Sequence, residues 1–250
     1  MRYLDEKDYI RDEKQHLKAR LAAGGAWTPD SRKVCYRSGL EVLCQAADGS
    51  GRAETMFKVD GLRNVKSLSS DGKRMFLEVR SQGTGDDIMM ATLGPLPEIR
   101  GLIQTKSLEL SPVLSPDGRW LAYDSDESGR SEVYVRPFPA VEQARTLVSV
   151  NGGIEPRWSP DGRELFFSTD AGSGPRTFWS VPVKSAAGFV AGTPVEVASI
   201  PTGSYDIARD GRLLVHLPTT TTAPSTRSQL VVVLHWFEEL KARVAAAAVP

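Results

Sequence analysis

The chain has 250 residues, 40% of them hydrophobic, and its 31 lysines and arginines balance its 31 aspartates and glutamates. One all-β domain can hold a chain of this length, which is long enough to bury most of its unfolded surface. The balanced charge leaves no overall positive field, so the sequence argues against nucleic acid as a partner. The longest apolar run near the C-terminus, residues 230–234, is too short to span a bilayer, and we therefore expect no membrane span.

Residues 1–25 are predicted to form a separate, charged helical segment. Good helix formers extend from Asp5 to Ala23, and Gly24 and Gly25 would end the helix. Its apolar stripe is narrow, which favours a solvated helix over one that contacts a partner or the end of the sheet stack. Because no apolar leader precedes it, we expect the chain as written to be cytoplasmic, and periplasmic or extracytoplasmic if its start has been lost.

A phrase built around an Asp-Gly turn then recurs five times. Its aspartates are spaced by 41, 46, 44 and 49 residues, at Asp30, Asp71, Asp117, Asp161 and Asp210. A period in the forties, with units rich in turns and in β-branched or aromatic residues, is typical of β-propeller blades. The sequence therefore predicts an all-β propeller of about five four-stranded blades over residues 26–241, either a closed or a partial ring, with a tail at 242–250.

Each repeat is predicted to be a hairpin whose aspartate caps the turn. Proline presets φ, aspartate bonds its local backbone, and glycine takes the position with positive φ. Ser31 replaces that glycine in the first copy, at a cost of about 1 kcal/mol. We expect the aspartates to serve these turns, so no metal site is predicted. Strand alternation would turn Glu155 and Arg157 toward a central channel, where we expect a solvated ion pair.

The two cysteines exclude a disulfide framework and a four-cysteine metal site. If Gly39 and Leu40 are the turn residues of a hairpin, Cys35 and Cys44 lie opposite each other across its strands. Two alternatives follow, a cross-strand disulfide or two free thiols, and buried free cysteine is common in protein cores.

The fifth copy has only three predicted strands, at 204–208, 213–217 and 229–237. Propellers usually take the missing strand from the other terminus, which a mainly helical N-terminus does not offer. Either the ring closes on five blades with an unusual last sheet, or the chain is part of a larger ring. An open blade face would then favour oligomerisation, a partner or aggregation.

Three stretches, 114–139, 152–167 and 229–240, resemble TolB-type WD-repeat-like propellers, in particular those that follow bacterial serine/threonine protein kinases. The resemblance covers about residues 26–241 and implies the fold, whereas such propellers serve many functions. In that family the ring begins with blades upstream of the copy that Trp27 opens, which favours a truncated or rearranged chain.

Motifs of catalysis are missing from the sequence. It has no glycine-rich phosphate loop or His-Arg-Asp loop of a kinase, and no Gly-x-Ser-x-Gly elbow of a hydrolase. The three histidines, His16, His216 and His235, are predicted to be structural. We therefore expect no enzyme activity, no catalytic residues and no cofactor.

The predicted function is a non-catalytic module that binds a protein or peptide, as a sensor or scaffold related to the propellers of bacterial kinases. One alternative is a TolB-like periplasmic accessory protein of an envelope or transport complex. Another is a gene fragment that folds poorly. The residues that would bind a partner are left open by the sequence.

Overall fold

The computed structural model describes residues 25–48, 50–169, 174–185, 188–200, 204–208, 211–217 and 229–233. Every regular element in these residues is a β-strand, and the strands form five antiparallel sheets in chain order. Each sheet is one of the repeats found in the sequence. The predicted all-β fold of five blades is thereby confirmed.

The first three blades have four strands each. Blade one contains β1 (Gly25–Trp27), β2 (Lys33–Ser38), β3 (Glu41–Ala46) and β4 (Glu54–Lys58). Blade two contains β5 (Leu62–Leu68), β6 (Arg74–Ser81), β7 (Gly85–Thr92) and β8 (Glu98–Ile103). Blade three contains β9 (Glu109–Leu114), β10 (Trp120–Ser125), β11 (Glu132–Pro137) and β12 (Thr146–Leu147).

The last two blades depart from this pattern. Blade four contains β13 (Ile154–Trp158), β14 (Glu164–Thr169), β15 (Arg176–Lys184), β16 (Val190–Ala191) and β17 (Val195–Ile200), and both β16 and β17 pair with β15. Blade five contains β18 (Ser204–Ile207), β19 (Leu213–Leu217) and β20 (Gln229–Val233). The three strands predicted for the fifth copy are therefore present in the described residues.

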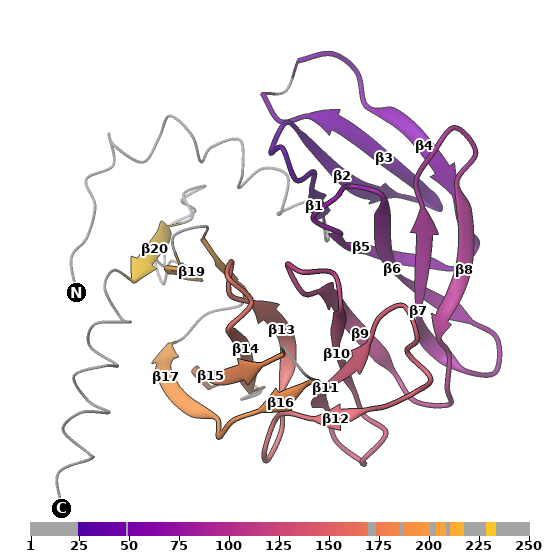
Figure 1. Cartoon of the computed structure of the whole chain (residues 1–250). Coiled ribbons are helices and arrows are strands. Elements are labelled where there is room, and N and C mark those ends of the chain that lie inside the picture. Colours follow the sequence, from indigo (N-terminus) through magenta and orange to yellow (C-terminus); the bar gives the residue numbers. More distant parts are fainter. Residues whose placement is uncertain are drawn as a thin grey trace, which may run out of the picture.

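The five blades follow one another around an arc, from blade one in indigo to blade five in yellow (Figure 1). The first strand of each blade is the innermost, and the inner strands contact one another in succession, from β1 through β5, β9 and β13 to β18. The four described turns of the repeated phrase, at Asp30, Asp71, Asp117 and Asp161, each join the first and second strands of a blade. They consequently lie on one side of the propeller, which we call the turn face.

Four apolar layers fill the spaces between neighbouring blades. Because side chains alternate across a strand, each sheet contributes to the layers on both of its faces. On β6, Met75 and Leu77 pack toward blade one, whereas Phe76 packs toward blade three. This two-sided burial explains why the strands are apolar on both faces.

The turn aspartates have the predicted role at the four copies that the structure describes. The Ser115 hydroxyl donates to Asp117 Oδ1 at 2.6 Å, and the amide of Arg119 donates to the same oxygen at 3.1 Å. Equivalent bonds occur at Asp30, Asp71 and Asp161. Asp210 lies outside the described residues.

The cysteines have the predicted register and form the disulfide that was one of the two alternatives. A turn at Gly39 and Leu40 joins β2 to β3, and Cys35 lies opposite Cys44 in this pair of strands. Their sulfurs are bonded, with the Cα atoms 4.0 Å apart. Blade one is therefore cross-linked within itself.

Several predictions fall outside the described residues. These are the helix at residues 1–25 apart from Gly25, the tail at 242–250, residues 234–237 of the last strand, and His16 and His235. The side chain of His216 is also not described. The domain boundaries stay predictions. Among the described residues, no helix has the length and apolar character needed to cross a membrane.

Candidate functional site: a cavity between blades one and two

A cavity of about 370 Å³ opens between blades one and two on the turn face. Blade one contributes the turn after β1, parts of β2 and β3, and Met56 of β4. Blade two contributes the end of β5, the turn that follows it, and the residue after β7. The lining residues are Thr28, Pro29, Asp30, Lys33, Cys35, Cys44, Met56, Leu68, Ser70, Asp71, Gly72 and Leu93.

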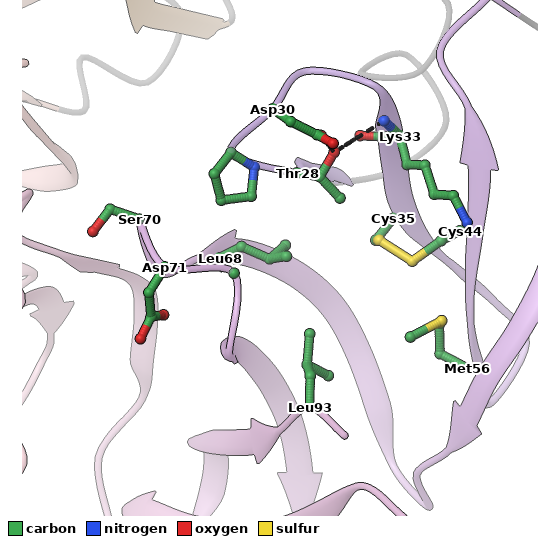
Figure 2. Close-up of a pocket in the computed structure, with 12 residues that line it drawn as sticks. Thr28, Asp30, Lys33, Cys35, Cys44, Met56, Leu68, Ser70, Asp71 and Leu93 are labelled. Atoms are coloured by element: carbon green, nitrogen blue, oxygen red, sulfur yellow. Dashed lines mark hydrogen bonds between the residues drawn. A yellow bond between two sulfur atoms is a disulfide. The ribbon is translucent and has the colours of Figure 1, made fainter. Parts of the chain in front are cut away.

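The wall of this interblade cavity is apolar and rich in sulfur. Figure 2 shows the Cys35–Cys44 disulfide and the Met56 thioether on one side, with Leu68 and Leu93 across from them. The disulfide belongs to the apolar layer between the two blades, in which both cysteines are buried. Met56 is 37% exposed, so part of this wall remains open to solvent.

Carboxylates of the first two turns lie at the rim. Asp30 Oδ1 accepts bonds from the Thr28 hydroxyl at 2.6 Å and from the Arg32 amide at 3.0 Å. The Thr28 hydroxyl therefore holds the pKa of Asp30 below its ordinary value, and the Ser69 hydroxyl lowers the pKa of Asp71 in the same way. Both carboxylates are charged at neutral pH.

Neighbouring turns contact each other along the turn face. A Cβ atom built on Gly72 would lie 3.7 Å from the Pro29 ring, and one built on Gly162 would lie 3.6 Å from the Pro116 ring. Between these two contacts, the Ser70 hydroxyl donates to the Pro116 carbonyl at 3.1 Å. The repeated turn phrase thus also determines how one blade meets the next.

A second group of polar residues lies deeper, where the inner strands meet. Buried Glu78 accepts a bond from the Ser111 amide at 2.7 Å, and buried Asp124 accepts one from the Glu155 amide at 3.0 Å. Ser111 and Glu155 both have positive φ, 54° and 55°, at bulges of β9 and β13. We call Glu78 and Asp124 the bulge acids, because each satisfies an amide that the bulge removes from the strand ladder.

Further side-chain bonds join the inner strands of blades two to five. Each runs from a side-chain donor to a backbone carbonyl of the neighbouring blade. The pairs are Ser67 to Pro112 at 2.7 Å, Trp158 to Val113 at 3.2 Å, and the Tyr205 hydroxyl to Glu155. These bonds, together with the bulge acids, leave the centre of the propeller densely cross-linked.

Glu155 and Arg157 do not form the predicted solvated pair. Glu155 accepts a bond from Arg176 Nη1 at 3.0 Å, and Arg157 Nε lies 3.6 Å from Asp206 Oδ1 of blade five. The reason is the bulge at Glu155, which breaks the two-residue alternation on which the prediction depended. Both side chains are only partly exposed, at 29% and 21%.

The sequence did not predict the interblade cavity. The register of the cysteine pair was readable, but sequence periodicity contains no information on how closely two neighbouring blades approach. Within the described residues, no cluster of three or more His, Cys, Asp or Glu side chains is arranged to hold a metal ion.

Comparisons with known proteins agree on the fold. No protein-family model matches the chain. The Tol-Pal system protein TolB of Alcanivorax borkumensis is 39% identical over 59 residues, which is 22% of this chain and 13% of that protein. The crystal structure of TolB from Acinetobacter baumannii has a TM-score of 0.68 at 18% identity, over 84% of this chain and 51% of that one.

Other solved structures share the fold as well. A TolB candidate from Agrobacterium tumefaciens has a TM-score of 0.62 at 17% identity, over 86% of this chain and 77% of that one. Enzymes also occur, among them an oligogalacturonate lyase in complex with manganese at a TM-score of 0.58 and a prolyl endopeptidase at 0.54. At 15% and 13% identity these two show only a common architecture.

The chain spans about half the length of the Acinetobacter TolB structure and a small part of the Alcanivorax protein. The likeness in fold nevertheless extends over most of the chain, and the sequence match points to the same group. The chain has the fold of a TolB-like β-propeller.

Proposed function

We propose that the chain is a TolB-like accessory protein that binds another protein and catalyses no reaction. The observation that carries this proposal is the likeness to TolB in fold, together with the match to a protein of the Tol-Pal system. This supports the accessory role, which the sequence offered as an alternative, better than the kinase-related sensor. A role in kinase signalling stays a prediction, and so does the cellular location.

We assign binding to the turn face. Its interblade cavity combines an apolar wall with a polar rim, which is the composition of a binding site. The turns around it are rigid, because each is capped by its aspartate. A surface that is already ordered loses little conformational entropy when a partner binds.

The test is direct binding between the purified full chain and the separately purified Tol-Pal components of the organism that encodes it, measured by titration calorimetry. One component is expected to bind with a Kd in the micromolar range or tighter, and a Kd of about 1 μM corresponds to a binding free energy of about −8 kcal/mol. If none binds at about 100 μM, a concentration at which a Kd of 10 μM would give near-saturation, the accessory role is wrong.

Two charge-matched variants locate the surface. Lys73→Glu with Arg163→Glu reverses two exposed charges on the turn face, and Lys58→Glu with Arg100→Glu reverses two on outer strands. The first pair is expected to change the affinity by about tenfold or more and the second by less than about twofold, because charge effects are local at physiological salt. Equal effects would contradict the turn-face assignment.

The absence of catalysis needs its own assay. The full chain is incubated with oligogalacturonate and with a proline-containing peptide, since enzymes acting on such compounds share its fold. No turnover above the buffer rate is expected. Turnover that is lost on a point substitution within the propeller would contradict the proposal.

A further inference from the structure

The chemistry of the interblade cavity restricts the kind of group that could occupy it. Three sulfur atoms face this one space, two from the Cys35–Cys44 disulfide and one from Met56 (Figure 2). Sulfur is polarisable and makes favourable contacts with aromatic rings, stronger than those of an aliphatic carbon of similar size. Leu68 and Leu93 provide an apolar surface for the other face of a ring.

The rim adds an exposed carboxylate, Asp30, with an oxygen that can accept a hydrogen bond from a ligand. Both turn carboxylates use Oδ1 for their turns, and Asp71 Oδ2 is also paired with Arg74 Nη1 at 3.3 Å. At Asp30, in contrast, the bonds from Thr28 and Arg32 both go to Oδ1, and the residue is exposed. The cation at the rim, Lys33, is already paired with Glu54 at 3.2 Å.

The size of the space limits the ligand further. At about 370 Å³ it lies near the lower end of ligand pockets, so it holds one large side chain and not an extended molecule. An aromatic group with an N–H donor can contact the sulfur-rich wall and donate to the exposed carboxylate of Asp30. Histidine and tryptophan both combine an aromatic ring with an N–H donor. The indole of tryptophan is the larger and more apolar of the two, and tryptophan is enriched among the residues that dominate protein interfaces.

We propose that the interblade cavity binds a tryptophan side chain of a protein partner, with the ring between the sulfur atoms and Leu68 and Leu93, and the indole N–H donating to Asp30. The proposal rests on the proposed function, because it names the anchor residue that a partner places on the turn face. It also makes blades one and two the part of the propeller that selects the partner.

The first experiment uses N-acetyl-L-tryptophanamide as the probe and the ε-methyl group of Met56 as the reporter. The full chain is labelled with ¹³C-methyl methionine, and the Met56 signal is assigned by its loss in Met56→Leu. An aromatic ring whose face covers this methyl group is expected to shift its proton signal upfield in a saturable way, with a Kd of about 1–10 mM for a lone side chain. N-acetyl-L-leucinamide is expected to bind at least about threefold more weakly, because it offers neither ring nor side-chain N–H.

Two variants of the loop after β7 provide the matched control. Leu93→Trp places an indole in the cavity and is expected to abolish the response of Met56 to the probe. Leu96→Trp introduces the same residue three positions further on, where the side chain is 91% exposed and does not line the cavity. It is expected to leave the response unchanged. The circular dichroism and the thermal midpoint of both variants show whether they fold.

The outcomes separate this inference from the proposed function. A Met56 signal that does not move, that moves equally with the leucine probe, or that still moves in Leu93→Trp overturns the tryptophan site. A Met56 shift that depends on protein concentration without any probe assigns the cavity to a second copy of the chain and overturns it as well. If a Tol-Pal component binds and Leu93→Trp does not weaken that binding, the function stands and the inference fails. If the probe binds as expected and no component binds, the site stands and the function fails.

Discussion

The packing between blades one and two, which we call the first interface, differs from the two interfaces that follow it. In blades two and three, a bulge acid stands nine residues after the residue that opens the Asp-Gly turn, and it bonds to the next blade. In blade one that position is Arg37, whose Nε is buried without a hydrogen-bond partner among the described residues. β5 also shifts register against β6, between Leu62 and Asn64 and between Val65 and Ser67, but none of its residues has the positive φ of Ser111 and Glu155.

The cavity lies at the interface that lacks a bulge acid. The second and third interfaces have polar bonds at their centre as well as apolar layers. At the first interface the described contacts are mainly apolar, and the space on the turn face is not filled. Blade one instead has a disulfide within itself. We infer that the propeller has two kinds of interface, one for rigidity and one that leaves room for a ligand.

The largest expected effect tests the polar kind of interface. Glu78 accepts bonds from the Ser111 amide at 2.7 Å and from Asn64 Nδ2 at 2.5 Å, and it lies 3.3 Å from Lys66 Nζ. Glu78→Ala would leave a buried amide and a largely buried cation without their partner. We expect a loss of about 3–5 kcal/mol in the free energy of unfolding, measured by urea denaturation.

The control for Glu78→Ala is Glu54→Ala in blade one. Glu54 pairs with Lys33, but the two side chains are 69% and 48% exposed. Solvent and salt screen such a pair, so the change in stability is expected to be within about 0.5 kcal/mol. If the two variants lose similar amounts, the polar bonds do not distinguish the interfaces.

The second prediction concerns Asp124, the bulge acid of blade three. Burial raises its pKa from 3.8 to about 6. Between these values the folded protein keeps a proton that the unfolded chain releases, so burial of Asp124 lowers stability as the pH rises from about 4 to above 6. Asp124→Asn keeps an oxygen for the Glu155 amide and removes this cost. The variant is expected to match the wild type near pH 4 and to exceed it by up to about 3 kcal/mol at pH 8.

The pH dependence of stability expected from Asp124 has the opposite sign to that expected from the turn aspartates. Asp30 and Asp71 at the first interface have lowered pKa values, so they stabilise the fold above pH 4 and lose this contribution as the pH falls. Their effect is the same in both proteins and cancels in the difference. Urea denaturation of both proteins from pH 4 to pH 8 gives that difference directly. A difference in the free energy of unfolding that stays constant from pH 4 to pH 8 would show that burial does not raise the pKa of Asp124.

The third prediction tests the disulfide of blade one. It closes a short loop, because Cys35 and Cys44 are nine positions apart in the sequence. Replacing both cysteines by serine is expected to lower the free energy of unfolding by about 2–3 kcal/mol. The disulfide joins β2 and β3, and the first interface has few polar bonds to hold these strands in its absence. Amide exchange is therefore expected to increase most in β2 and β3 and to remain unchanged in β10 and β11.

The control for the disulfide is chemical. The native protein, assayed without reductant, is expected to show no titratable thiols, and two after treatment with a dithiol in denaturant. Two free thiols in the untreated native protein would contradict the disulfide and restore the other alternative for the cysteine pair.

Much of the fold could be predicted from the sequence because the information is local. The Asp-Gly phrase fixes a hairpin by its own backbone preferences, and its recurrence fixes the number of blades. The same locality gave the register of Cys35 and Cys44. The cavity and the partners of Glu155 could not be predicted, because they depend on bulges and on contacts between residues far apart in sequence. The sequence did contain one signal of the difference between the interfaces, because Arg37, Glu78 and Asp124 occupy equivalent positions of their repeats.

The smallest expected effect concerns the turn of blade one itself. Ser31 has φ of 58°, at the position where the other described turns have Gly72, Gly118 and Gly162 with φ between 68° and 74°. A side chain in this left-handed region is strained, so Ser31→Gly is expected to stabilise the protein by about 0.5–1 kcal/mol, measured as a raised urea midpoint. The reverse change, Gly162→Ser, places the same strain in blade four and is expected to cost a similar amount. If Ser31→Gly destabilises the protein instead, the first turn depends on serine contacts that outweigh its backbone strain, and the turn next to the cavity is built differently from the others.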